Sequence, residues 1–246
     1  MTPSEINAAL PLLDESWGRA LCVVAHPDDL EYGTAAAVHR WVGQGKQVSY
    51  LLATRGEAGI DGLSPQEAAP LREQEERDGA HHVGVDVVEF LDQRDGVVEY
   101  GLGLRRDLAR AIRRHRPEVV VGITHRERFM GGGTNQADHR AVGLAALDAS
   151  KDAGNRWIFP ELAEQGLEPW SGVRMVCFSG SPEPTHGLDV TGHLEPAVAS
   201  LEAHRQYLAG LSGGHPAPAE LLQTILGGAG ERLGVEHALL FEVFDL

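Results

Sequence analysis

A His-Pro-Asp-Asp quartet follows a short apolar run, and its residue types suit metal-assisted chemistry. The run 21–25 ends at His26, and Pro27 separates this imidazole from Asp28 and Asp29. Pro27 fixes its own φ at about −65° and biases His26 towards an extended backbone, so the chain turns sharply. His26 and Asp29 can then converge on one point, while Asp28 faces that point differently. One imidazole and one carboxylate are two of the three N/O ligands that a catalytic zinc site typically has.

A second Asp-His pair offers the third ligand. Asp138 and His139 open a run with apolar residues at helical spacing, which places His139 in the first turn of a helix. An Asp immediately before a helix is also a preferred N-cap, and Asp138 can cap the helix while His139 binds a metal. A lone His-Pro-Asp-Asp is more often a capped turn than a metal site. The prediction of a metal site therefore rests on the two motifs together.

The elements around these motifs predict an α/β fold. The segment 21–25 is apolar at every position, and the segment 118–123 is apolar after its first residue, Glu118, which is typical of strands buried on both faces of a parallel sheet. Ligands of such sheets bind outside the carboxyl ends of the strands, which is where both motifs fall. We expect a Rossmann-like, doubly wound, mostly parallel sheet with helices on both faces. The remaining expected elements are strands at 48–54 and 86–91, helices at 33–44, 71–82 and 104–115, and a loop at 55–70.

The C-terminal third has a weaker pattern. It predicts strands at 173–179 and 238–244, helices at 194–211 and 219–233, and loops at 154–172 and 181–184. No repeat or low-complexity linker divides the chain. We therefore expect a single domain over 1–246, with the catalytic motifs within 20–145 and the C-terminal third completing the pocket.

Composition excludes several classes of partner. The chain has 246 residues, 42% of them hydrophobic, and a formal net charge of −15, which argues against a nucleic-acid partner. No stretch approaches 18 consecutive apolar residues, and the first 16 residues lack a basic segment followed by an apolar one, so we expect a cytoplasmic protein without membrane contact. Cys22 and Cys177 lie in apolar runs and are expected to be buried thiols. A homo-oligomer is left open.

The chain resembles a known family at three motifs. They are Ala25-His26-Pro27-Asp28-Asp29, then Thr54-Arg55-Gly56-Glu57-Ala58-Gly59, and then Asp138-His139-Arg140-Ala141-Val142-Gly143, in this order over roughly the first 150 residues. This order and spacing resemble the LmbE-like, PIG-L type zinc deacetylases. The resemblance implies one Zn²⁺ per chain, held by His26, Asp29 and His139, with other divalent metals possible. It also implies that Asp28 is the general base.

Electrostatics supports this division between the two carboxylates. A base needs a pKa near the operating pH, whereas a ligand must stay ionised. The charged form of Asp28 is disfavoured by its neighbour, while a bound cation favours the charged form of Asp29. Zinc lowers the pKa of its water towards about 7 and polarises a carbonyl. The reaction class is then hydrolysis of an amide.

One position departs from the family. Many relatives have a His three residues before the last ligand, and this chain has Gln136, which donates a hydrogen bond but delivers no proton at neutral pH. We assign Gln136 a catalytic role as a donor to the developing oxyanion. His125 is the nearest candidate for a relocated proton donor, although a lone loop His is more often merely solvated.

Arg55 and Asp95 match positions where the family places polar pocket residues, and we group them with His125 as substrate-binding. An ordinary ion pair on a loop is the alternative for Arg55 and Asp95. The segment 126–133, with its apolar tip and three glycines, could form a mobile lid.

The resemblance implies removal of an acetyl group from an N-acetylglucosamine-type sugar amide. Three alternatives stay open. One is an amidase that acts on thiol-sugar conjugates with the same site. Another is metal-dependent phosphate-ester hydrolysis, which usually needs two metals. The third is a metal-binding relative with weak or no turnover, for which Gln136 is the evidence.

Overall fold

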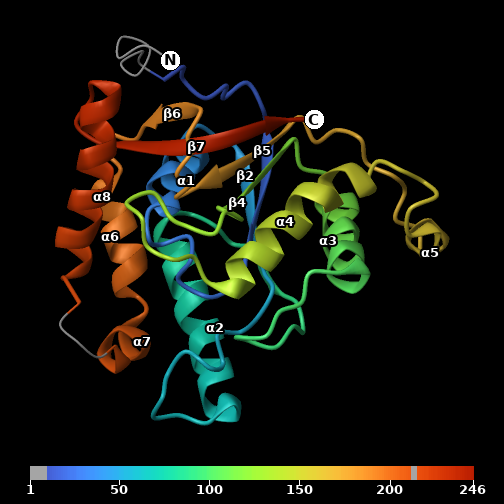
Figure 1. Cartoon of the computed structure of the whole chain (residues 1–246), viewed down its shortest axis with the longest axis horizontal. Coiled ribbons are helices and arrows are strands. Elements are labelled where there is room, and N and C mark those ends of the chain that lie inside the picture. Colours follow the sequence, from blue (N-terminus) through green and yellow to red (C-terminus); the bar gives the residue numbers. More distant parts are fainter. Residues whose placement is uncertain (1–9, 212–214) are drawn as a thin grey trace.

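The computed structural model describes residues 10–211 and 215–246. Residues 1–9 lie outside it, and part of the prediction of a cytoplasmic protein rests on them. Its strands form a seven-stranded sheet within these residues, in the order β3-β2-β1-β4-β5-β7-β6 (Figure 1). The first five strands are parallel, and β7 runs antiparallel to both β5 and β6. The predicted α/β, mostly parallel architecture is confirmed. The strands are β1 (Arg19–Val24), β2 (Gln47–Leu52), β3 (Val88–Phe90), β4 (Val119–Ile123), β5 (Met175–Ser179), β6 (His186–Asp189) and β7 (Ala238–Asp245).

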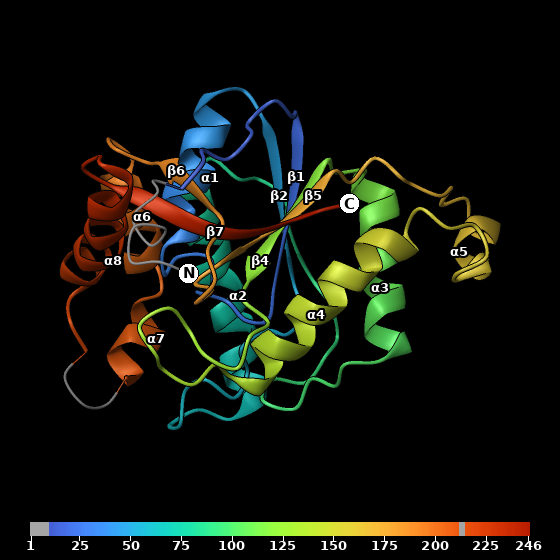
Figure 2. The same ribbon diagram turned by 45° about the horizontal axis from the view of Figure 1, so that its top comes forward.

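Helices cover both faces of the sheet (Figures 1 and 2). One face packs against α1 (Thr34–Gly43), α2 (Pro65–His82), α6 (Leu194–Glu202) and α8 (Pro218–Leu233). The other face packs against α3 (Leu102–His115) and α4 (Ala137–Asp152), with the short α5 (Pro160–Glu164) at its margin. The short α7 (Arg205–Gly210) follows α6.

After its first residue, the sequence of β1 is apolar because helices cover the sheet on both faces. Because side chains alternate along a strand, Cys22 and Val24 face the α1 side, whereas Leu21 and Val23 face the α4 side. Burying one such side chain stabilises the fold by about 1.5–3 kcal/mol. On the α1 side, the fully buried Trp41 packs between other aromatic rings, with its centroid 5.1 Å from that of Trp17 and 6.2 Å from that of Phe241. Trp41 thereby connects α1 to the segment before β1 and to β7.

Two predicted boundaries were wrong. Helix α2 begins at Pro65 rather than near 71, because Ser64 and Glu67 form a capping box and Pro65 occupies the first turn, where its missing N–H costs nothing. The predicted helix 194–211 is two helices, because His204 has a ψ of 53° that ends the helical backbone. The short α5 lies in the segment 154–172, which was expected to be a loop, and β6 lies in a segment for which no element was predicted.

The carboxyl ends of β1, β2, β3 and β4 lead into the segments that carry the chemistry. Residues 25–33, 53–64, 91–101 and 124–136 leave these ends. Among the described residues, every helix is too short or too polar to traverse a lipid bilayer.

Candidate metal centre and substrate cavity

The turn after β1 separates the two neighbouring aspartates. Asp28 has a φ of 83°, in the left-handed region that few non-glycine residues adopt. Its backbone N–H donates to Oε2 of the buried Glu76 at 3.0 Å, which holds this conformation. Oδ2 of Asp29 accepts the N–H groups of Ala25 (3.0 Å) and His26 (2.9 Å). Asp29 is therefore fixed with its second oxygen, Oδ1, free to face the site.

Three ligand atoms converge at this point. Nε2 of His139 lies 3.0 Å from Oδ1 of Asp29 and 3.2 Å from Nδ1 of His26. These side chains could hold a metal ion, since one ligand atom of each lies within 4.8 Å of the others. Bonds of about 2.0–2.1 Å in a tetrahedral zinc site place ligand atoms roughly 3.3 Å apart. The spacing fits that geometry.

The hydrogen bonds of Asn135 fix the tautomer of His139. The side-chain amide of Asn135 donates to the carbonyls of Thr124 (2.6 Å) and Arg126 (2.9 Å), so its oxygen points the other way. That oxygen lies 2.9 Å from Nδ1 of His139 and can only accept. His139 must therefore carry its proton on Nδ1 and present the lone pair of Nε2 to the site.

Two carboxylates fix the opposite tautomer of His26, with its proton on Nε2. Nε2 of His26 lies 3.1 Å from Oδ1 of Asp95 and 3.3 Å from Oδ2 of Asp138, so it carries the proton and Nδ1 presents a lone pair to the site. Burial opposes a charge on this ring, yet hydrogen bonds with Asp138, Asp29 and Asp95 raise the pKa of His26 to about 12. A positive charge is therefore favoured at Nδ1, and a bound metal ion would supply it in place of a second proton. The donor set thus favours a cation at the point where its lone pairs meet.

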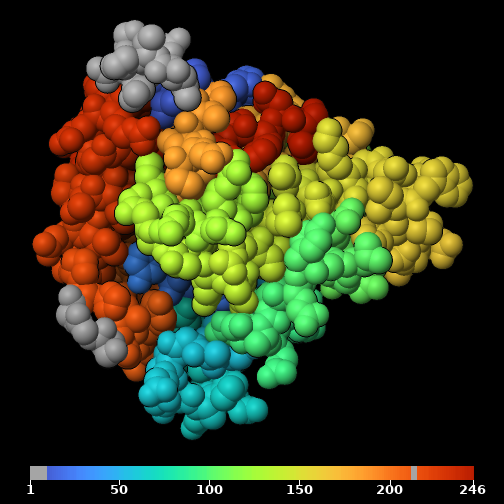
Figure 3. Space-filling model, in the orientation of Figure 1, coloured from blue at the N-terminus to red at the C-terminus, as the bar shows by residue number. Residues whose placement is uncertain are grey.

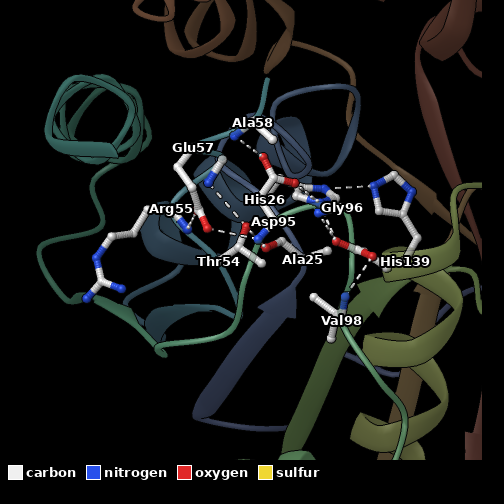
Figure 4. A network of polar contacts seen from close by, with 12 residues as sticks. Ala25, His26, Thr54, Arg55, Glu57, Ala58, Asp95, Gly96, Val98 and His139 are labelled. Atoms are coloured by element: carbon white, nitrogen blue, oxygen red, sulfur yellow. Dashed lines mark hydrogen bonds and ion pairs between the residues drawn. The ribbon is translucent and has the colours of Figure 1, made fainter. Parts of the chain in front are cut away.

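Neighbouring loops hold the two orienting carboxylates in place, as Figure 4 shows for Asp95. Asp138 accepts the backbone N–H of Gly96 at 2.7 Å and of Val98 at 3.1 Å. Asp95 accepts the N–H of Ala58 at 2.8 Å, and its own N–H donates to Glu57 at 2.9 Å. Asp138 is the second residue of α4 and the N-cap is Gln136, so the expectation that Asp138 caps the helix was wrong.

Asp28 stands apart from the three candidate ligands and pairs with Arg72. The guanidinium of Arg72 donates to Oδ2 of Asp28 (3.1 and 3.3 Å) and to the carbonyl of Pro27 (2.6 Å), and it lies 3.8 Å from the ring centre of Tyr207. Burial raises the pKa of Asp28 to about 6, with the Asp29 carboxylate adding to the rise and Arg72 opposing it. Gly56 makes room for this arginine, since a Cβ at that position would lie 2.9 Å from Nε of Arg72.

Two cavities meet at the candidate metal centre. A polar cavity of about 220 Å³ is lined by the three candidate ligands and by other residues, namely Asp28, Tyr32, Gly56, Gly59, Arg72, Asp95, Gln136 and Tyr207. An apolar cavity of about 400 Å³ shares Asp29, Tyr32 and His139 with it and extends towards α8 and β7. A hollow of about 550 Å³ between α2 and α7 contains none of the predicted site residues.

The structure brings most of the sequence-predicted site residues together, but not all. His26, Asp28, Asp29, Asp95, Gln136 and His139 line the polar cavity. Arg55 does not line it, because its guanidinium pairs with Glu73, with Asp92 at 2.9 Å and with the carbonyl of Leu91 at 3.0 Å, and Figure 4 shows it directed away from His26 and His139. His125 does not line it either. Its ring packs against Phe178 and Phe244, and burial lowers its pKa.

Sequence reasoning missed that Asp138 orients His26, and it missed several other residues of the site, among them Asn135, Arg72, Glu76 and Tyr207. Asn135 lies four residues before His139, a spacing at which residues share a helix face, so it had a readable signal. Arg72, Glu76 and Tyr207 reach the site from α2 and α7, far along the chain from the β1 turn, and no local pattern marks them.

The fold and this site together define a class: a doubly wound α/β protein with a candidate mononuclear metal centre and an adjacent carboxylate, as in metal-dependent hydrolases. The family model described as PIG-L, GlcNAc-PI de-N-acetylase, matches residues 21–150. The chain belongs to this family of deacetylases, which hydrolyse amides.

Two curated relatives share a type of substrate in their names. A diacetylchitobiose deacetylase of Thermococcus kodakarensis is 29% identical, over 76% of this chain and 68% of its own length. A 1D-myo-inositol 2-acetamido-2-deoxy-alpha-D-glucopyranoside deacetylase of Kineococcus radiotolerans is 30% identical, over 83% of this chain and 72% of its own. The fold matches N,N'-diacetylchitobiose deacetylase from Pyrococcus horikoshii with a TM-score of 0.83 at 24% identity, covering 94% of this chain and 85% of that one.

Proposed function

We propose that this protein hydrolyses the acetamide of an N-acetylated amino sugar, with one divalent metal, best zinc, held by His26, Asp29 and His139. The observation that carries this proposal is the pair of fixed tautomers. Asn135 turns the lone pair of His139 Nε2, and Asp95 with Asp138 turns that of His26 Nδ1, towards the point that Oδ1 of Asp29 faces. Three acceptor atoms this close repel one another unless a cation lies between them. Two imidazoles and one carboxylate suit zinc and would also accept iron(II) or cobalt.

The metal and Asp28 would act on the same water molecule in different ways. When bound, such an ion lowers the pKa of a water molecule towards about 7 and polarises a carbonyl oxygen. Asp28 lies outside the ligand set, lines the same cavity, and has one oxygen held by Arg72. It is positioned to accept the proton of the attacking water.

Gln136 would act on the substrate's oxygen. It lies at the N-cap of α4, lines the polar cavity and is exposed to it. Its amide N–H group can donate to the carbonyl oxygen as negative charge develops there. Because this needs only hydrogen-bond donation, the replacement of a His by Gln is compatible with turnover.

The polar cavity supports a sugar on the amine side of the amide. Arg72, Asp95, Gln136 and Tyr207 offer donors and acceptors for hydroxyl groups. The two curated relatives described above are both named for substrates that carry an acetamido sugar. Arg55 and His125 stay predictions as substrate-binding residues, since neither lines this cavity.

Acetate release tests the proposal. The zinc-loaded protein is incubated with N-acetylglucosamine, diacetylchitobiose and the inositol-linked acetamido sugar, and acetate and free amine are measured. We expect equal amounts of both products from at least one sugar, loss of activity with a chelator, and recovery on adding zinc. A protein that holds about one zinc per chain and releases no acetate from any of them would contradict the proposal and favour a relative without turnover.

A further inference from the structure

The apolar cavity beside the candidate metal centre is larger than an acetyl group needs. It measures about 400 Å³, and its walls include Phe129 and Met130 from the loop before α4, Ile225 and Ala229 from α8, and Leu239 from β7. A methylene group fills roughly the volume of one water molecule, about 30 Å³, so a chain of eight carbons needs only about 240 Å³. In Figure 3, blue atoms of the first 50 residues are seen in a recess between the yellow-green loop and the red-orange helices.

The hydroxyl groups of this cavity away from the candidate metal centre are already paired. The hydroxyls of Thr34 and Ser179 lie 2.9 Å apart, and Ser179 also donates to the carbonyl of Gly122 at 3.4 Å. Sugar hydroxyls would lose water here without gaining equivalent partners, which is unfavourable. The cavity therefore suits a hydrocarbon group and not the sugar.

The geometry of an amide then decides which part of the substrate enters it. A secondary amide is planar and trans, so its acyl chain and its nitrogen substituent leave on opposite sides of the C–N bond. With the sugar among Arg72, Asp95 and Gln136, the acyl chain points away from the polar cavity. The two cavities share Asp29, Tyr32 and His139, so the opening into the apolar cavity lies at the reacting carbonyl itself.

The loop before α4 completes the far wall. Its tip is tied to the fold by a hydrogen bond from the backbone N–H of Met130 to the carbonyl of Gly180 (2.8 Å), and Arg232 of α8 lies 3.2 Å from the Met130 sulfur. The ring of Phe129 stands edge-on to His139, with centroids 6.0 Å apart. The cavity is thus bounded by side chains on both sides of the expected path of an acyl chain.

We propose that this cavity is an acyl subsite, so that the protein accepts, besides acetamides, amino sugars with an unbranched N-acyl chain of about six to eight carbons, and cleaves these with higher efficiency. The inference rests on the proposed function and specifies the substrate of that site. In the reaction, the oxygen of water bonds to the acyl carbon, the C–N bond breaks, and a proton passes to the leaving nitrogen, giving a fatty acid and the free amino sugar.

A chain-length series on the zinc-loaded, unmodified protein tests the proposal. The substrates are glucosamine with N-acetyl, N-butyryl, N-hexanoyl and N-octanoyl groups, together with the octyl and methyl glycosides of N-acetylglucosamine. Each buried methylene favours binding about threefold to fourfold. We expect kcat/KM to rise on the order of 10²-fold from acetyl to hexanoyl.

Ile225→Trp, which places a large ring at the cavity wall, is compared with Thr224→Trp, which places the same ring one residue away on α8, outside the cavity lining. Only Ile225→Trp should lower the ratio of octanoyl to acetyl kcat/KM, by about tenfold or more. Thermal unfolding and zinc content show whether each variant is folded. The chain-length series on the unmodified protein tests the proposal even if a variant fails to fold.

Three results would overturn the inference in distinguishable ways. Acetyl cleaved as fast as or faster than hexanoyl and octanoyl leaves the proposed function intact and removes the acyl subsite. A gain with the octyl glycoside but not with longer acyl groups assigns the cavity to the aglycone. Hydrolysis of none of the substrates removes the proposed function together with the inference.

Discussion

The side-chain oxygen of Asn135 lies 2.9 Å from Nδ1 of His139, and this contact decides which nitrogen of the imidazole faces the candidate metal centre. Asn135→Ala should therefore weaken zinc binding by about 10- to 100-fold, the usual effect of losing an orienting partner. Competition with a chromogenic chelator measures the dissociation constant. Asn155→Ala, at an exposed turn, is the control and should bind zinc as the unmodified protein does. Unchanged affinity in Asn135→Ala would show that His139 is oriented by something else.

The candidate ligands should be separable from other histidines by metal content. His139→Ala removes one of three ligand atoms, so the purified protein should lose most of its bound metal. His82→Ala changes an exposed His at the end of α2 and should keep about one ion per chain. Elemental analysis of both variants checks this. Full metal content in His139→Ala would rule out the ligand set.

Asp28 and Asp29 are adjacent in sequence but should differ in role. Asp28→Asn should keep the metal and lose about 10²–10⁴-fold in kcat, because an amide of the same shape accepts no proton. Asp29→Asn should lose the metal. Asp61→Asn, an exposed carboxylate near the same edge, should change neither property. If Asp28→Asn loses zinc and Asp29→Asn keeps it, the two roles are reversed.

Gln136 and His125 give opposite mutational expectations. Gln136 lines the polar cavity and His125 does not, so Gln136→Ala should cost on the order of 10²-fold in kcat/KM, the low end for one lost oxyanion donor. His125→Ala should cost little in kcat/KM. A large loss in His125→Ala, together with loss of the alkaline limb of the pH profile, would instead show that His125 donates the proton.

The buried Glu242 should make the stability of the fold depend on acidic pH. Burial raises the pKa of this carboxyl, but Arg126 and Ser181, whose hydroxyl lies 2.6 Å from Oε2, outweigh burial and lower it. A carboxyl with a lowered pKa contributes stability that is fully present above its unfolded value, about 4.5, and is lost as pH falls below it.

Glu242→Gln should accordingly lower the free energy of unfolding by about 1.5–3 kcal/mol at pH 7, as for a lost charged hydrogen bond. The difference should shrink below about pH 4.5. Glu183→Gln, which removes an exposed partner of the same arginine, should cost less than about 1 kcal/mol. Urea titrations at several pH values measure both variants. A difference for Glu242→Gln that stays constant down to pH 3 contradicts the assignment.

The sequence predicted those parts of the fold and the site that depend on local pattern. The first motif stands directly after β1, and the second follows β4 after the loop 124–136. Parallel strands bring their carboxyl ends to one edge, so the sequence alone predicted that His26, Asp29 and His139 come together. The start of α2 was missed because Pro70 suggested a loop, although Ser64 and Glu67 have the residue types and the spacing of a capping box. The break at His204 was missed because a single non-helical residue leaves the apolar periodicity unchanged.

The partners of the site could not be read in the same way. Arg72 reaches Asp28 across 44 residues, and Asp138 reaches His26 across 112. Which charged residue of a helix turns inward depends on how that helix packs. The sequence of α2 contains several charged residues, and nothing local distinguishes Arg72 and Glu76 from the exposed ones.

The left-handed backbone of Asp28 has a consequence for how this family diverges. At a φ of 83° glycine adopts this backbone without strain, so Asp28→Gly relieves strain at the turn. The same change leaves the buried guanidinium of Arg72 without its ion-pair partner, which is destabilising. A descendant that abandons catalysis but keeps the fold should therefore change residues 28 and 72 together, Asp28 to glycine and Arg72 to an uncharged residue. We expect relatives in which both residues have changed in this way to be inactive.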